Sequence, residues 1–247
     1  MKLTNAELAA LPEKCKRDPA IVALYQQHDY LQAYALHTDR RVFTTGYQDA
    51  AGADASRNNW DSHGNLQRDF LIMQGLQPNH MLLEIGCGAG RLARKAVPYL
   101  AASCYYGLDI SGAAVAAARH LAAIEGWGEK HPVFWQVGVD DQPRTHWFDF
   151  IWAHSVFTHL PPDLVQSVMR QASNYLAPRG KFLWTYIEST DNTRYGLMQF
   201  KNKWEVYEEA THKAGLTLTK IPDWVQLAGY TPGRWSGEQH VALSQHE

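Results

Sequence analysis

Three alternate glycines open the stretch of sequence that is best suited to bind a ligand. They lie in "LLEIGCGAGRLARK", residues 82–95, where Gly86, Gly88 and Gly90 separate an apolar run from a helix-like run. Glycine lets a backbone approach a ligand closely, and the amides of such a loop favour a negatively charged group. Asp109 follows in "YYGLDIS", where a carboxylate at a strand end can accept hydrogen bonds from both hydroxyls of a ribose. Together these residues predict a nucleotide-binding site.

Two classes of nucleotide cofactor use this arrangement. Nicotinamide enzymes have the motif G-x-G-x-x-G/A. If the motif begins at Gly86, its sixth residue is Arg91, which is a mismatch. If it begins at Gly88, the segment "GAGRLA" matches. No tyrosine in the chain has a lysine four residues later, so the usual catalytic pair of short-chain dehydrogenases is missing. The second class places an acid two residues before a G-x-G-x-G loop, and Glu84 occupies that position.

The elements around the loop predict the fold. Strand-like apolar runs cover 80–85, 103–110, 132–137, 148–155, 181–188, 216–221 and 240–245. Helix-like segments cover 90–100, 111–125, 161–176 and 202–214. This alternation predicts an α/β protein with a doubly wound, mostly parallel seven-stranded sheet and helices on both faces. Residues 1–65 have mixed helical character, and we expect them to form an N-terminal cap on a domain that covers 66–247.

With these elements in place, the sequence resembles the class I S-adenosylmethionine-dependent methyltransferases over about residues 58–245. "LLEIGCGAGRLA" is similar to the first motif of that family and "YYGLDIS" to its second. "FDFIWAHSVFTHLPPD" is similar to its fourth-strand motif, "YLAPRGKFLWT" to the turn into its fifth strand, and "HVALSQ" to its final antiparallel strand. The third motif departs from the pattern, because Gly138 and Val139 precede Asp140, which places the acid one residue late.

The resemblance implies S-adenosyl-L-methionine as cofactor and S-adenosyl-L-homocysteine as product. Asp109 would bind the ribose, Ile110 would lie against the adenine, and Glu84 would order the loop or contact the methionine amino group. Asp140, or a backbone amide near Val139, would hold the adenine amino group. The implied cofactor-binding residues are Glu84, Gly86, Cys87, Gly88, Gly90, Asp109, Ile110, Val139, Asp140, Ala153 and His154. The residues alone also allow Asp109 to be a helix-capping acid and Cys87 to be a small filler.

Two histidines lie at the end of the fourth predicted strand and just beyond it, where the transferred methyl group lies in the family. His154 and His159 flank "SVFT", and we expect His159, or failing it His154, to act as the general base. An imidazole has a pKa near neutrality and suits this task. The alternative is a histidine that only bonds backbone at the start of a helix. Their five-residue spacing is not typical of metal ligands, and no metal is predicted.

By analogy with the family, the region around Trp60 and His63 is expected to fold over the cofactor pocket, and an insertion at about 186–203 is expected to cover the acceptor. The polar and aromatic candidates for substrate binding are Trp60, Tyr186, Glu188, Arg194 and Tyr195. Alternatively, Trp60 is an aromatic residue that packs the cap onto the domain, and the other four residues belong to a solvated loop.

The composition limits the kind of partner. The formal net charge is −2, which gives no electrostatic footprint for nucleic acid. No apolar run approaches the roughly 20 residues of a membrane span. Cys15, Cys87 and Cys104 are scattered, and we expect a reduced cytoplasmic protein. The predicted function is methyl transfer to a small-molecule acceptor, preferably at oxygen; a nicotinamide-dependent oxidoreductase and a non-catalytic cofactor-binding protein of the same fold stay open.

Overall fold

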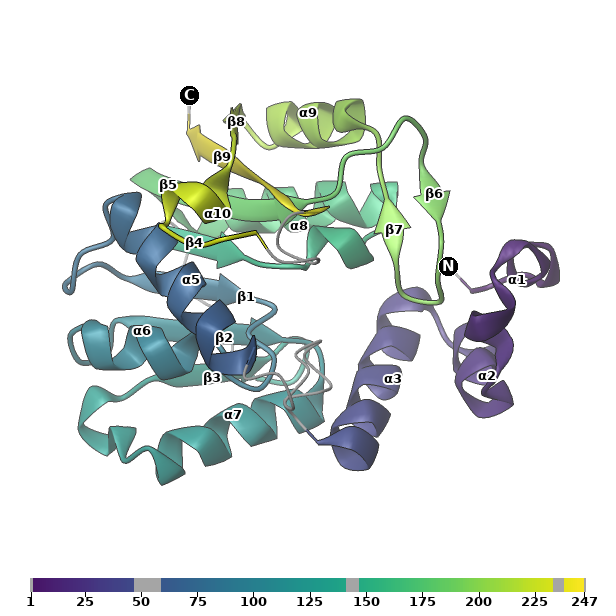
Figure 1. The fold of residues 1–247 in the computed structure, drawn as a ribbon, viewed down its shortest axis with the longest axis horizontal. Helices are drawn as coiled ribbons and strands as arrows, with labels where there is room; N and C mark the ends of the chain where they lie inside the picture. The colour runs from purple at the N-terminus through teal and green to yellow at the C-terminus, as the bar shows by residue number, and fades with distance from the viewer. Residues whose placement is uncertain (1, 47–58, 141–146, 233–237, 247) are drawn as a thin grey trace.

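The seven predicted strands form one twisted sheet at the centre of the molecule (Figure 1). The structure, a computed structural model, describes residues 2–46, 59–140, 147–232 and 238–246. The strand order is β3-β2-β1-β4-β5-β9-β8. Their bounds are β1 Leu82–Ile85, β2 Tyr105–Asp109, β3 Val133–Gln136, β4 Phe148–Ala153, β5 Leu176–Tyr186, β8 Leu216–Ile221 and β9 His240–His246.

The sheet is parallel except at one edge. β1 pairs in parallel with β2 and β4, β2 with β3, and β4 with β5. β9 runs antiparallel between β5 and β8. The strand order reverses between the neighbouring strands β1 and β4. This position is the topological switch point, where such sheets bind ligands. The predicted doubly wound fold is confirmed.

Helices cover both faces of the sheet with separate apolar clusters. α5 (Asn59–Met73), α6 (Ala93–Tyr99), α7 (Gly112–Ile124) and the short α10 (Trp224–Leu227) pack on one face. α8 (Pro162–Tyr175) and α9 (Trp204–Lys213) pack on the other. α7 is an alanine-rich helix with high intrinsic propensity, and the Ser111 side chain caps it by accepting from the Ala114 amide at 3.1 Å.

The turn predicted before the fifth strand lies inside that strand. Leu176 pairs with Phe148, and the next pair joins Lys181 with Phe150. Four residues of β5, 177–180, therefore stand against a single residue of β4 and bulge from the ladder. Pro178 has no amide hydrogen to donate to the ladder, which explains why the irregularity falls there.

The N-terminal residues form a small helical unit beside the carboxyl edge of the sheet. It contains α1 (Asn5–Ala10), the 3-10 turn η1 (Glu13–Lys16), α2 (Pro19–Gln27) and α3 (Tyr30–Thr45). The predicted insertion folds as a two-stranded hairpin, β6 (Thr193–Arg194) and β7 (Phe200–Lys201), and it packs on these helices (Figure 1). The helices and the hairpin share one apolar cluster, to which the hairpin contributes Leu197, Met198 and Phe200.

Candidate functional site

The glycine loop forms a tight turn that only glycine can make without strain. Gly86, Gly88 and Gly90 have φ angles of 73°, 54° and 90°, in the left-handed region that other residues avoid. The amides of Gly86 and Cys87 donate to the Leu108 carbonyl at 2.7 and 2.9 Å. A Cβ on Gly86 would lie 2.5 Å from Val156 Cγ2. The loop is therefore clamped between β2 and the segment that follows β4.

Asp109 joins the loop to the start of α7. Its Oδ2 accepts from the Gly88 amide at 2.9 Å and its Oδ1 from the Ser111 amide at 2.8 Å. Burial raises the pKa of Asp109, and the two amide hydrogen bonds act in the opposite direction. No described protein atom lies within 4 Å of the position that a Cβ on Gly88 would take. A carboxylate and bare backbone thus meet beside open space.

Glu84 is buried beneath the loop, where it is 4% exposed. Its Oε2 accepts a short hydrogen bond from the Tyr105 hydroxyl. Burial raises the pKa of Glu84 to about 8, although this hydrogen bond and the charge of Arg91 both lower it. The carboxyl group is therefore mainly protonated at neutral pH unless a cationic group of a ligand lies beside it.

Replacing Glu84 with glutamine should flatten the pH dependence of stability. The folded pKa of about 8 lies above the ordinary value of 4.5, so the folded protein binds more protons than the unfolded chain between these values. The contribution of Glu84 to the free energy of unfolding is therefore fully present below pH 4.5, declines as the pH rises from 4.5 to about 8, and is lost above pH 8. Relative to the variant, the wild type should lose up to about 1.4 kcal/mol per pH unit. Urea denaturation from about pH 5 to pH 8 checks this; parallel curves for the two proteins would contradict it.

His154 connects the glycine loop to the end of β4. Its Nδ1 lies 3.1 Å from Arg91 Nη2 and 3.2 Å from the Ser155 hydroxyl. A guanidinium only donates hydrogen bonds, so Nδ1 accepts and the neutral ring carries its proton on Nε2. Burial, followed by the charge of Arg91, holds the pKa of His154 well below its usual value. The lone pair that a base needs is thus already engaged.

His159 has the opposite arrangement. Its Nδ1 faces the Met198 carbonyl of the hairpin. A carbonyl only accepts, so Nδ1 carries the proton and the lone pair of the neutral ring lies on Nε2. Burial lowers the pKa of His159, and the charge of Arg41 acts in the same direction, against the Met198 hydrogen bond. The Tyr34 ring packs on the imidazole with a centroid distance of 5.4 Å, and the Tyr30 hydroxyl donates to the His159 carbonyl at 2.6 Å.

α3 reaches the glycine-loop region as well as His159. Asp39 accepts from the Ser111 hydroxyl and, at 3.0 Å, from the Ala113 amide at the start of α7. The charge of Asp109 raises the pKa of Tyr34, although burial is the larger cause. Tyr34 therefore packs on the histidine expected to be the base, within electrostatic reach of the carboxylate expected to bind ribose. Sequence reasoning missed this contact, although Tyr30, Tyr34 and Arg41 share one face at helical spacing.

Trp60 lies at the glycine loop and not at the hairpin. It is buried and packs with Ala89 of the loop and with Ala117 of α7. One turn further along α5, Gly64 approaches so closely that a Cβ there would lie 2.7 Å from the Arg91 carbonyl. The structure thus places Trp60 beside the loop expected to bind cofactor.

The other four predicted acceptor residues do not converge on one surface. Tyr186 is 1% exposed within an aromatic cluster that includes Trp184 and Tyr207. Glu188 pairs with Lys220 at 3.0 Å on the surface. Burial raises the pKa of Tyr195, and Lys201 Nζ lies 5.2 Å from its ring centre.

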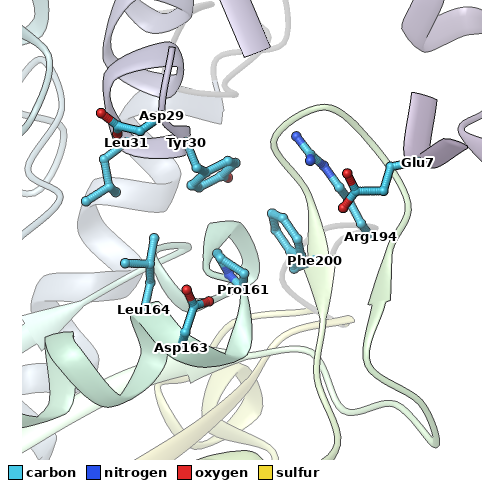
Figure 2. Close-up of a pocket in the computed structure, with 9 residues that line it drawn as sticks. All are labelled: Glu7, Asp29, Tyr30, Leu31, Pro161, Asp163, Leu164, Arg194 and Phe200. Carbon is cyan, nitrogen blue, oxygen red and sulfur yellow. The ribbon is translucent and has the colours of Figure 1, made fainter. Parts of the chain in front are cut away.

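Arg194 fastens the hairpin to the N-terminal helices. Its guanidinium lies 5.6 Å from the ring centres of Tyr25 and Tyr30 and 5.3 Å from that of Phe200. Figure 2 shows Arg194 and Phe200 on the hairpin facing Tyr30 of α3, with Glu7 of α1 beside the guanidinium. Since Arg194 also donates to the Leu197 carbonyl at 2.6 Å, it closes the hairpin turn against the cap.

The residues of the third motif are held in a turn after β3. Asp140 Oδ2 accepts from the Gln136 amide at 2.6 Å and from Arg119 Nη2 at 2.8 Å. The Val139 amide donates to the Gln136 carbonyl at 3.1 Å. An adenine contact would have to share these groups. Ile110 is half-buried and Ala153 is fully buried at the strand ends, whereas Cys87 packs in the apolar cluster under the loop and burial raises the pKa of its thiol.

Neither a membrane span nor a metal cluster emerges from the described residues. In that part of the chain no helix has the length and apolarity needed to cross a bilayer. No group of three or more His, Cys, Asp or Glu side chains there could hold a metal ion.

A protein-family model described as a methyltransferase domain matches residues 83–182. The structure is similar to that of magnesium protoporphyrin IX methyltransferase from Synechocystis PCC 6803, solved with bound S-adenosylhomocysteine. That structure has a TM-score of 0.61 and 14% identity, over 86% of this chain and 99% of that chain. Phosphoethanolamine N-methyltransferase 2 from Haemonchus contortus has a TM-score of 0.61 and 15% identity, over 89% of this chain and 61% of that chain.

A TehB-like methyltransferase from Corynebacterium glutamicum has a TM-score of 0.56 and 17% identity, over 86% of this chain and 99% of that chain. At such identities the structural likeness shows the fold, and the family-model match identifies the domain that carries the glycine loop. Residues 83–182 of the chain therefore match a methyltransferase domain on an α/β fold. More specifically, its fold is that of the class I S-adenosylmethionine-dependent methyltransferases, and two of these similar structures were solved with bound S-adenosylhomocysteine.

Proposed function

We propose that this chain transfers the methyl group of S-adenosylmethionine to an oxygen atom of a small-molecule acceptor. The observation that carries the proposal is the state of His159, whose Nδ1 faces a carbonyl, so that the lone pair of the neutral ring lies on Nε2. A hydroxyl is a weak nucleophile and gains from a positioned base, whereas an uncharged amine needs none.

The residues around the glycine loop suit the cofactor. Asp109 offers a carboxylate for ribose hydroxyls, the loop offers bare backbone at Gly88, and Glu84 offers a carboxyl group for an ammonium. Bound S-adenosylmethionine supplies a sulfonium methyl that is already electrophilic. The protein then needs mainly to align the nucleophile with the methyl and to exclude water.

His159 would take the acceptor proton on Nε2 as the new carbon–oxygen bond forms and the carbon–sulfur bond breaks. Partial burial keeps its imidazole neutral at neutral pH, so no proton has to leave before it acts. The Met198 carbonyl fixes the ring orientation and would stabilise the Nδ1 proton of the imidazolium. Tyr34 and the hairpin would exclude water from this side of the site.

Two alternative functions, a nicotinamide-dependent oxidoreductase and a non-catalytic cofactor-binding protein, have less support. The nicotinamide hypothesis gains no support from the family-model match, and the "GAGRLA" loop alone carries little weight. A protein of this fold can also catalyse another reaction, since one similar structure, at a TM-score of 0.53 and 18% identity, is that of the [4+2]-cyclase SpnF. Binding and turnover must therefore be measured separately.

The decisive experiment uses a tritiated methyl donor and sets of acceptors that differ only in a hydroxyl, amine or thiol group. We expect label mainly in oxygen-methylated products. Calorimetry with S-adenosylhomocysteine and with NADH runs in parallel. Label confined to nitrogen or sulfur products would refute oxygen transfer; cofactor binding with no transfer across the sets would favour the non-catalytic alternative, and NADH binding alone would favour the oxidoreductase.

A further inference from the structure

Ser155 has a backbone conformation that its residue type disfavours, two residues after the end of β4. Its φ angle is 59°, in the left-handed region that residues other than glycine seldom adopt. Such a conformation persists only where the surrounding structure holds it, and it is frequent at functional sites. The contacts of Ser155 therefore show what fixes this segment of the chain.

A buried glutamine from near the end of the sequence holds Ser155. Gln239 is 9% exposed and lies immediately before β9. Its Nε2 donates to the Ser155 hydroxyl at 2.8 Å, and its Oε1 accepts from the Thr185 hydroxyl at 2.6 Å. The Thr185 oxygen in turn accepts from the Ser155 amide at 2.7 Å. The carboxamide therefore acts on Ser155 directly and also through Thr185 of β5.

The main chain of Gln239 is fixed by a buried tryptophan. The Gln239 carbonyl accepts from Trp224 Nε1 at 2.8 Å, and Trp224 is 2% exposed. The Trp224 ring also lies 5.9 Å from the His154 ring, edge to face. The carboxamide thus extends from an anchored main chain toward the segment that follows β4.

Ser155 connects the glycine loop with the proposed base. On one side, its hydroxyl lies 3.2 Å from Nδ1 of His154, which also accepts from Arg91. On the other side, the Ser155 carbonyl accepts from the Thr158 hydroxyl at 3.1 Å, which closes the turn that ends at His159. The conformation of Ser155 therefore sets the path of the chain from the loop region to His159.

We propose that Gln239 is a positioning residue for methyl transfer: its carboxamide holds Ser155 in the left-handed conformation, and this conformation places His159. The inference rests on the proposed function, in which His159 is the base. A carboxamide suits this task, because it offers a donor and an acceptor side by side for the two hydroxyls. Within the described part of the chain Gln239 has no hydrogen bond to His159, so it acts through Ser155.

The kinetic test compares Gln239→Leu, Ser155→Gly and the double variant. Leucine is similar in size to glutamine but its side chain forms no hydrogen bond, so Gln239→Leu should lower turnover about 10- to 100-fold by misplacing a reacting group. Glycine adopts a positive φ without strain and has no hydroxyl to hold. Adding Gln239→Leu to Ser155→Gly should therefore change turnover by less than about twofold. Additive losses would overturn the proposal, because Gln239 would then act elsewhere.

A second readout requires neither turnover nor cofactor. Proton–nitrogen NMR correlation spectra show which imidazole nitrogen carries the proton, and in the wild type we expect Nε2 for His154 and Nδ1 for His159. Gln239→Leu should shift the Nδ1 signal of His154 and give His159 a mixture of both tautomers. Gln239→Met, whose flexible side chain fills the same space, should do the same and is measured if Gln239→Leu does not fold.

Gln245→Leu is the matched control, because it makes the same change at the opposite end of β9. It should leave the histidine spectra and turnover unchanged. Wild-type spectra in Gln239→Leu, or the same spectral changes in Gln245→Leu, would overturn the proposal, whatever the melting temperatures. If the wild type methylates no acceptor, the proposed function fails, and the spectra still decide whether Gln239 positions the histidines. If the wild type methylates oxygen and Gln239→Leu keeps its turnover, the inference alone fails.

Discussion

Replacing His159 with alanine should lower turnover by about 10²–10⁴-fold, the usual contribution of a general base. The affinity for S-adenosylhomocysteine should stay nearly unchanged, because His159 contacts the hairpin and α3 and not the glycine loop. The reason for the loss is chemical: the variant has no lone pair at the position of Nε2 to take the acceptor proton. Steady-state kinetics and calorimetry on the same preparation check both expectations.

The pH profile separates a base from a structural residue. Burial lowers the pKa of His159 below 6.5, so kcat/KM for the wild type should be constant at neutral pH and fall as the pH drops below that pKa. In His159→Ala this acidic limb should disappear. His120→Ala serves as control, since His120 is exposed on α7. Normal turnover per folded molecule, together with a lower melting temperature, would make His159 a structural histidine.

The glycine loop and the strands were predictable because their signals are local. Alternate glycines with positive φ, an acid two residues before them and an aspartate at the next strand end all lie within 28 consecutive positions, 82–109. The alternation of aromatic residues along β5 also indicates where Tyr186 lies. Phe182, Trp184 and Tyr186 alternate along β5 and lie together in one buried cluster, so their period of two favours a core position for Tyr186 over an acceptor contact.

The relation between the cap and the active-site region was not predictable from local pattern. Tyr30 bonds to His159 across 129 positions, and the Met198 carbonyl that orients His159 is 39 positions away. Such contacts depend on how α3 and the hairpin pack against each other. The spacing of residues within either segment does not predict that packing. Arg91 illustrates the same limit: it breaks one glycine motif in the sequence, but in the fold it joins Glu84 electrostatically to His154.

The two candidate histidines differ in the hydrogen-bond partner of Nδ1. Arg91 donates to Nδ1 of His154, whereas a carbonyl faces Nδ1 of His159. The two rings therefore carry their protons on opposite nitrogens, although their sequence contexts gave no reason to separate them. A hydrogen-bond partner that only donates or only accepts decides which histidine keeps a free lone pair.

Asp109→Ala should weaken S-adenosylhomocysteine binding by tenfold or more, because each lost hydrogen bond to a charged group is worth about 1.5–3 kcal/mol. The variant loses an acceptor for the ribose and also the bond that holds the Gly88 amide in the loop. Calorimetry gives the affinity, and urea denaturation without ligand shows whether the fold survives.

Ser111→Ala is the informative comparison: Ser111 caps α7 through its hydroxyl, and its amide still donates to Asp109. Losing that cap should lower stability by about 1 kcal/mol with little effect on affinity. If Asp109→Ala behaves like Ser111→Ala, with a lower unfolding midpoint and unchanged affinity, Asp109 is a helix-capping acid and the cofactor ribose is held elsewhere.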